Sequence, residues 1–290
     1  MIDREPTSPW VASSRKEAED WVLVLAAAGI SSKIEKIPGG WALTVAWRDQ
    51  ERVAKELAAF QEENQAEAEG SNGGVEYGKT YAGFAAAACL LGFYVVTGPR
   101  DPAVAWFLLG SASAEAILSG ETWRAVTALT LHADLPHVVA NAVSCAVFVT
   151  AVCRQVGPGI GAWLVLLAGA TGNTINAFAH GVHHSSIGAS TALFGAIGIL
   201  AGLQFTRRQR RPARRPRSWV PVAAGLALLA MLGTGRDVDI AAHFFGFAAG
   251  APLGAVAAAG VRRPPAAGVQ WPIALAAAGA VVGCWLIALG

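Results

Sequence analysis

The stretch 242–254 decides the fold of this chain; it reads AHFFGFAAGAPLG and combines one histidine with glycines four residues apart. Gly246, Gly250 and Gly254 share one face of a helix, because residues four apart lie above one another. Small residues on one face let a neighbouring helix approach closely, as membrane helices do. His243 lies on the same apolar helix, where an ionisable group is costly and indicates function. The stretch therefore predicts a closely packed membrane helix with a functional histidine.

The chain beyond Tyr77 has the composition of a membrane protein. It is 54% hydrophobic and 14% charged overall, whereas soluble domains have roughly 25% charged residues. A membrane-spanning helix needs about 20 mostly apolar residues. We expect seven spans, at 79–97, 137–156, 160–179, 187–206, 218–233, 238–258 and 270–289. Charged residues interrupt the segment 101–136, which is expected to form a structured loop in or on the outer leaflet.

Arginines predict the orientation in the membrane. The gap 207–217 between the fourth and fifth spans holds seven arginines in eleven residues, which makes it cytoplasmic under the positive-inside rule. Arg154 and the pair Arg262 and Arg263 agree with this side. The N-terminus is then cytoplasmic in a plasma or inner membrane, and the loop 98–136 lies outside. The basic run is explained by its place between two spans, so no nucleic-acid partner is expected.

Residues 1–70 resemble a small soluble domain with an α+β pattern. The expected elements are a helix at 15–29 capped by Ser13 or Ser14 and ended by Gly29, strands at 31–37 and 41–47, and a helix at about 49–66. The glycine-rich end of 66–74 reads as a flexible linker. This domain shows no catalytic constellation, and we expect it to bind a partner or a regulator in the cytosol.

The expected fold class is an all-α polytopic membrane protein with a six-helix core and a seventh transmembrane helix, preceded by the α+β domain. The expected divisions are 1–70 for the cytosolic domain, 71–78 for the linker, 79–258 for the six-span core, and 259–290 for a linker and the seventh helix. The four cysteines fall in or beside apolar segments, where packing is a commoner role than disulfide formation.

Ser190 and His243 both lie near the outer ends of their expected spans. Each is four or five residues in, so at 1.5 Å per residue both would be about 6–8 Å below the interface. Equal depth is what a serine needs to pass its proton to an imidazole. A lone membrane serine usually bonds to its own backbone, but the equal depth and the glycine face favour a pair.

His137 and Asn141 are four residues apart and share the outer end of the second expected span. An imidazole and an amide there can donate hydrogen bonds to an oxyanion that forms on a substrate carbonyl. The alternative is that both residues form hydrogen bonds between helices.

Four short motifs follow one another along the chain: Glu121-Thr122-Trp123-Arg124, His132 to Asn141 with His137 between them, Gly188-Ala189-Ser190, and Ala242-His243 with Gly246 and Gly250. In this order they resemble the motifs of the rhomboid family of intramembrane serine proteases. The resemblance covers about residues 80–258. It implies a rhomboid-like six-helix core and the cleavage of transmembrane protein substrates in the lipid bilayer, without a cofactor or a metal.

The resemblance also implies roles for single residues. Ser190 and His243 would form a catalytic dyad without an aspartate. Asn141, His137 and backbone N–H groups near Ser190 would bind the oxyanion. The loop motif with Glu121, Trp123 and Arg124 would brace the outer loop, and His132 would form hydrogen bonds within it.

Two features depart from the motifs or stand beside them. Thr191 occupies a position where the family often has glycine, and its branched side chain is expected to crowd the site slightly. The loop 179–186 contains His180, His183 and His184 with no acidic residue nearby in the sequence. We expect these histidines to be solvated, and not to bind a metal.

Two other functions compete with proteolysis. One is a catalytically inactive rhomboid-like protein that binds membrane clients, although the presence of both Ser190 and His243 argues against it. The other is a small transporter with histidines as a proton relay. A relay needs an acidic partner inside a span, and the second to sixth expected spans hold only Asp239, at an end.

Overall fold

The computed structural model describes residues 10–71, 76–181, 183–210, 223, 239–261 and 263–290. The chain divides into two compact units, Met1–Gly74 and Val75–Gly290. Apart from residue 223, the fifth expected span at 218–233 lies outside the described residues.

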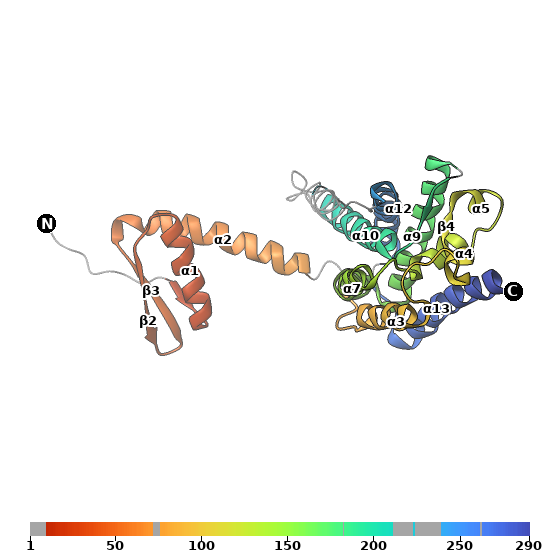
Figure 1. Ribbon diagram of the computed structural model, residues 1–290. Helices are drawn as coiled ribbons and strands as arrows, with labels where there is room; N and C mark the ends of the chain where they lie inside the picture. The colour runs from red at the N-terminus through yellow and green to blue at the C-terminus, as the bar shows by residue number, and fades with distance from the viewer. Residues whose placement is uncertain (1–9, 72–75, 182, 211–222, 224–238, 262) are drawn as a thin grey trace. The chain divides into compact units, whose positions relative to one another are not determined.

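The N-terminal unit is a three-stranded antiparallel sheet with two helices (Figure 1). Its elements are β1 (Trp10–Ala12), α1 (Arg15–Ala27), β2 (Ser32–Ile37), β3 (Gly40–Val45), a short 3₁₀ helix (Trp47–Asp49) and α2 (Gln50–Ser71). The strand order is β1-β3-β2. Trp21, Leu25, Leu43 and Val53 are buried between sheet and helices and form its core.

Local signals set the bounds of the two helices. The Ser14 hydroxyl accepts a hydrogen bond from the Glu17 N–H at 3.2 Å, and the Glu17 carboxylate accepts one from the Ser13 N–H at 2.8 Å. The pair resembles a capping box, with the Glu17 carboxylate bonded to the residue before the N-cap Ser14. Helix α2 continues to Ser71, five residues beyond the expected end at about residue 66. The glutamates and alanines of 66–69 are good helix formers, so the helix end expected at about residue 66 was wrong.

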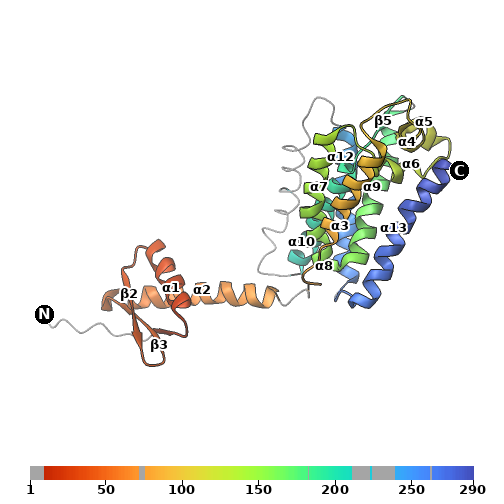
Figure 2. The same cartoon turned by 60° about the horizontal axis from the view of Figure 1, so that its bottom comes forward.

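The second unit is a helix bundle. Its long helices are α3 (Ala82–Thr97), α7 (Leu135–Ser144), which continues through a π-helical turn (Cys145–Val149) into α8 (Thr150–Val156), then α9 (Pro158–His180), α10 (Ser190–Gln209), α12 (Ile240–Gly260) and α13 (Ala267–Leu289). The loop between α3 and α7 contains α4 (Ala105–Gly110), β4 (Ala112–Ser113), α5 (Ala114–Leu118), α6 (Arg124–Thr127) and a 3₁₀ turn (Ala128–Thr130). Figure 2 shows α4, α5, α6 and β5 (Ser185–Ser186) gathered at one end of the bundle.

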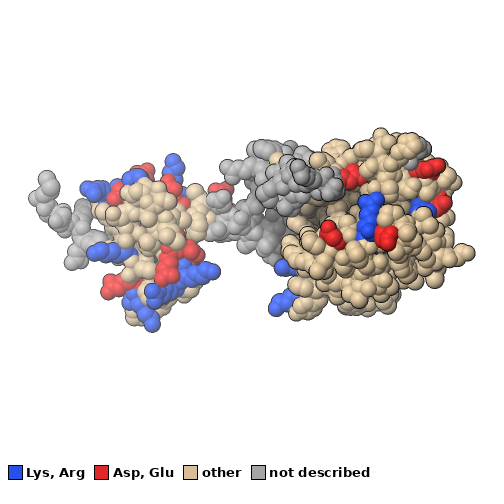
Figure 3. Space-filling view, viewed as in Figure 1, with Lys and Arg blue, Asp and Glu red and all other residues tan. Residues whose placement is uncertain are grey.

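The second unit is an integral, multi-pass membrane domain. Four described helices are long and apolar enough to cross a membrane: 135–156, 158–180, 240–260 and 267–289. Helix α3 is apolar but shorter, with 16 residues. The face drawn in Figure 3 carries charged side chains of both signs over both units, with larger uncharged areas over the second unit.

The glycine face of α12 packs directly on the backbone of α10. A Cβ atom added to Gly246, Gly250 or Gly254 would collide with the carbonyl oxygen of Thr191, Gly195 or Ile199, respectively. The contact is reciprocal, because a Cβ at Gly198 or Gly202 of α10 would collide with carbonyls of α12. The close approach that the sequence predicts for this helix is therefore present, and the neighbouring helix is α10.

Both ends of α13 are fastened to the bundle. The fully buried Gln270 accepts hydrogen bonds from the N–H groups of Gly159 and Ile160 at 2.8 and 3.1 Å, which the start of α9 would otherwise leave unpaired. At the other end, the Trp285 indole donates to the Thr130 hydroxyl at 3.0 Å. The seventh expected helix is thus part of the packed unit.

Replacing Gly250 with alanine should destabilise the membrane unit. The added methyl group would overlap the Gly195 carbonyl, and overpacking of this kind costs about 1–3 kcal/mol. Gly283→Ala in α13 is the matched control, because a Cβ there meets nothing within 4 Å. Thermal unfolding in detergent should show a lower midpoint for Gly250→Ala only. Equal midpoints for the two variants would contradict the close packing of α10 and α12.

Candidate active site

Ser190 is the first residue of α10, and it is half-buried. The helix begins three residues later than the expected span at 187–206, so the expectation that Ser190 lies a full turn inside its helix was wrong. The later start of the helix matters for the chemistry of Ser190, because the first N–H groups of a helix have no hydrogen-bond partner within that helix. The hydroxyl of Ser190 therefore lies beside backbone donors.

Gly188 lets a histidine approach the serine. Its φ of +125° is a conformation that residues with side chains rarely adopt, and its N–H donates to the Ala128 carbonyl at 2.9 Å. A Cβ at Gly188 would lie 2.9 Å from Nε2 of His137 and 3.6 Å from Oγ of Ser190. The His137 ring and the Ser190 hydroxyl therefore border the same small space above Gly188.

The orientation of His137 makes it a hydrogen-bond donor toward that space. Asp134 caps α7 by accepting the His137 N–H at 2.8 Å, which fixes the first turn. The ring Nδ1 accepts a hydrogen bond from the Ala133 N–H at 3.3 Å. A neutral imidazole that accepts at Nδ1 carries its proton on Nε2, so we assign Nε2–H as the group that faces Gly188.

Asn141 lies one turn further along α7 and is 4% exposed. Its amide donates to the His137 carbonyl at 2.9 Å, within its own helix. This bond belongs to the structure without a substrate. The expected role of Asn141 as an oxyanion donor needs its second amide proton or a small rotation, and it stays a prediction.

His243 lies in the first turn of α12 and is 6% exposed. Its ring packs on the Phe194 ring, with centroids 4.4 Å apart and planes 30° apart. Phe194 is four residues after Ser190, so the two share one face of α10. The contact between α10 and α12 therefore brings the imidazole to the helix face of the serine. No described residue forms a hydrogen bond with Nδ1 of His243.

His132 supports the residue before the serine. The ring is fully buried, and its Nε2 accepts a hydrogen bond from the Ala189 N–H at 3.4 Å. The pKa of His132 is lowered to about 4, mainly because the ring is buried and also because His137 lies nearby. A hydrogen bond with the Thr130 backbone acts in the opposite direction and raises this pKa. The ring is therefore neutral near pH 7, which accepting at Nε2 requires.

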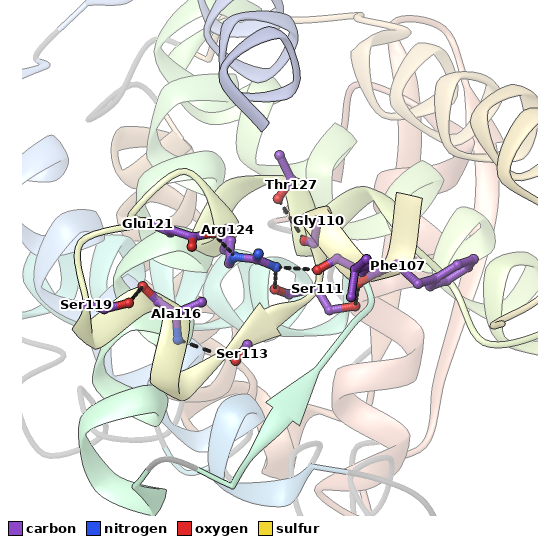
Figure 4. A network of polar contacts seen from close by, with 10 residues as sticks. Phe107, Gly110, Ser111, Ser113, Ala116, Ser119, Glu121, Arg124 and Thr127 are labelled. Atoms are coloured by element: carbon purple, nitrogen blue, oxygen red, sulfur yellow. Dashed lines mark hydrogen bonds and ion pairs between the residues drawn. The ribbon is translucent and has the colours of Figure 1, made fainter. Parts of the chain in front are cut away.

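The loop motif forms a buried brace (Figure 4). Nε of Arg124 donates to the Glu121 carboxylate at 2.6 Å, and a terminal nitrogen donates to the carbonyls of Leu108 at 2.9 Å and Ser111 at 3.3 Å. The side chain of Arg124 is 8% exposed, so these partners replace water. Trp123 precedes the arginine at the start of α6. The contacts of Arg124 support a bracing role for Glu121 and Arg124, and the role expected for Trp123 stays a prediction.

The brace reaches the serine through a short pair of strands. Strand β4 directly follows Ser111 and pairs antiparallel with β5, with Ala112 opposite Ser186. The Ala114 N–H also donates to the His184 carbonyl at 2.9 Å. The outer loop and the segment before Ser190 are thus one hydrogen-bonded structure.

Thr191 is accommodated by two glycines. It is 4% exposed, and a Cβ added to Gly172 of α9 or to Gly246 of α12 would lie 2.8 or 3.2 Å from its Cγ2 atom. The methyl group therefore fills the space that these glycines leave between three helices. The two glycines therefore relieve the crowding that we expected from this side chain.

Sequence reasoning missed one polar cluster. His184 Nε2 lies 2.7 Å from Oδ2 of Asp239, and the Asn176 amide donates to the same oxygen at 2.7 Å. The expectation of a solvated His184 without an acidic neighbour was therefore wrong. Asp239 is 55 residues further along the chain, so no local pattern connects the two. Its position four residues before His243 was the available signal, because Asp is a preferred helix cap.

Comparison with known proteins finds similarity to one family. The family model described as "Rhomboid domain" matches residues 119–260. GluP of Bacillus subtilis (strain 168), a rhomboid protease, is 34% identical over 100 residues, which cover 34% of this chain and 19% of that protein. The rhomboid-like protease 3 of Toxoplasma gondii is 32% identical over 151 residues, which cover 50% of this chain and 56% of that protein.

A third relative, YdcA of Bacillus subtilis (strain 168), is provisionally named a rhomboid protease. It is 25% identical over 134 residues, which cover 46% of this chain and 66% of YdcA. The chain thus spans less than two thirds of the length of each of these three relatives.

The stability of the protein should depend on pH through His132. The unfolded ring titrates near 6.5 and the folded ring near 4, so between these values only the unfolded state takes up the proton. The stabilisation is complete above pH 6.5, and about 3 kcal/mol of it is lost as the pH falls toward 4.

His132→Gln isolates this contribution, because the amide oxygen can accept from Ala189 but does not titrate. The fall in unfolding midpoint from pH 7 to pH 4.5 should be larger in the wild type than in this variant. An equal fall in both proteins would show that His132 does not carry the pH dependence.

Proposed function

We propose that this chain, which belongs to the rhomboid family, is an intramembrane serine protease with Ser190 as nucleophile and His243 as base. It would hydrolyse a peptide bond in, or next to, a transmembrane segment of a membrane protein. The observation that carries the proposal is the glycine-lined contact of α10 with α12, in which the His243 ring packs on Phe194 one turn from Ser190.

The reaction follows from the groups around the serine. His243 accepts the Ser190 proton as Oγ attacks the substrate carbonyl carbon, and the carbonyl oxygen becomes negatively charged. The donors for this oxyanion are Nε2–H of His137, the Asn141 amide and the free N–H groups at the start of α10. The intermediate collapses with protonation of the leaving amine by His243. Water then hydrolyses the acyl-enzyme by the reverse sequence of proton transfers.

The position of the serine favours substrates with weak helices. A stable transmembrane helix hides its carbonyls in hydrogen bonds, so a cut needs a segment that unwinds easily. Ser190 is half-buried at a helix start, and there an extended substrate and water would reach it more easily than in the middle of a helix.

The two units would work on different sides of the membrane. The arginine pattern supports a cytoplasmic N-terminal unit and an outward-facing loop around Glu121 and Arg124. In this arrangement the N-terminal unit is a cytosolic module for a partner or a regulator.

Replacing either member of the dyad should abolish cleavage. Ser190→Ala and His243→Ala should each reduce turnover of a transmembrane substrate in liposomes at least about 1,000-fold, because nucleophile and base act as a unit. Ser185→Ala is the matched control, an exposed serine in the same loop that should leave turnover unchanged. A fluorophosphonate probe should label the wild type but not Ser190→Ala.

Two outcomes would contradict the proposal. Cleavage by Ser190→Ala or His243→Ala at the wild-type rate would remove the dyad. A wild type that neither cuts several substrates nor reacts with the probe would instead support an inactive rhomboid-like protein that binds membrane clients.

A further inference from the structure

Three elements of the membrane unit meet at the carboxylate of Asp239. Oδ2 accepts hydrogen bonds from the Asn176 amide of α9 and from His184 Nε2, each at 2.7 Å. Oδ1 accepts the Ala242 N–H at 3.0 Å and so caps α12. The side chains of Asp239 and His184 are 18% and 27% exposed, and Asn176 is 1% exposed. We call Asn176, His184 and Asp239 the clasp.

The clasp joins the two segments that hold the proposed dyad. Asp239 is one turn before His243, whose N–H donates to the Asp239 carbonyl at 3.2 Å. His184 is six residues before Ser190, in the segment that runs through β5. The clasp therefore ties the start of the histidine helix to the approach of the serine, and both to α9.

The clasp joins one acidic side chain to two nitrogen groups. Asn176 Nδ2 donates to Oδ2, His184 Nε2 lies 2.7 Å from the same oxygen, and the two nitrogens are 3.0 Å apart. With the carboxylate ionised, we assign Nε2–H of His184 as the second donor, and hydrogen bonds to a charged acceptor are stronger than neutral ones. A neutral helix cap, such as serine, could bond the Ala242 N–H but could not hold these two donors.

We propose that Asp239 is a positioning residue, which sets the His243 imidazole against the Ser190 hydroxyl by fastening the start of α12 to the His184 segment. This inference rests on the proposed proteolytic function. Its physical basis is that a shift of about 1 Å between reacting groups can cost 100-fold in rate. Among the described residues, the Asp239 carboxylate bonds Asn176, His184 and the Ala242 N–H, and not Ser190 or the His243 ring, so its loss should act on turnover far more than on substrate binding.

Serine and alanine substitutions separate capping from positioning. Asp239→Ser keeps a good helix cap but cannot reach His184, and His184→Ala removes the partner while leaving the cap intact. The control is His183→Ala, an exposed histidine beside His184. In liposomes that contain a transmembrane substrate, Asp239→Ser and His184→Ala should each lower kcat about 10- to 100-fold, with KM changed less than about threefold.

The double variant and a conservative variant test whether the clasp acts as a unit. Asp239→Ser combined with His184→Ala should be no slower than the slower single variant, because both changes break one interaction. His184→Gln should recover most of the rate, since its amide can donate to Asp239. Labelling of Ser190 by a fluorophosphonate should slow in parallel with kcat, and His183→Ala should match the wild type.

The outcomes separate this inference from the proposed function. If Asp239→Ser and His184→Ala cut and label like the wild type while Ser190→Ala is inactive, the positioning role fails and the protease stands. If their losses follow a lower folded fraction, measured by unfolding at the assay temperature, the clasp is only structural and the inference is also overturned. If the wild type is inactive and unlabelled, both proposals fail together.

Discussion

The membrane unit depends on the direct contact between the backbones of α10 and α12. Lipid offers no hydrophobic drive for helices to associate, so close packing of small residues must hold them together. Glycines on both helices provide this contact, each facing a carbonyl of the other. At these glycines the two backbones approach each other with no side chain between them. The residues that α10 and α12 carry at their first turns, Ser190 and His243, therefore inherit a defined relative position.

The loops then fix the end of the bundle at which α10 begins. The buried guanidinium of Arg124 holds the loop between α3 and α7 through three acceptors, and β4 continues from there to pair with β5. His132 accepts the N–H of Ala189 directly before the helix. Each bond satisfies a polar group that burial would otherwise leave unpaired, at about 1–3 kcal/mol per group. The same bonds that stabilise the loop thus fix the residue before the serine.

Features with a local or periodic signal could be predicted from the sequence. The glycine spacing of α12, the caps of α1, the strands of the N-terminal unit and four of the long apolar helices were read correctly from their own residues. The start of α10 was missed, because hydropathy continues through residues 187–189 while Gly188 breaks the helix with its positive φ. The clasp of His184 with Asp239 was missed for a different reason: the contact exists only after α9, the loop and α12 have packed.

The histidines show why residue type alone could not assign the site. His132 is buried and accepts at Nε2, whereas His137 accepts at Nδ1 and directs Nε2 toward Gly188. His184 donates to a carboxylate, and His243 packs on an aromatic ring with its Nδ1 unbonded in the described part of the chain. The same type of side chain thus makes four different sets of contacts. In the reaction we propose, the base must be a histidine ring that is not already held as a hydrogen-bond donor or acceptor by a fixed partner. Among these four histidines, His243 meets this criterion.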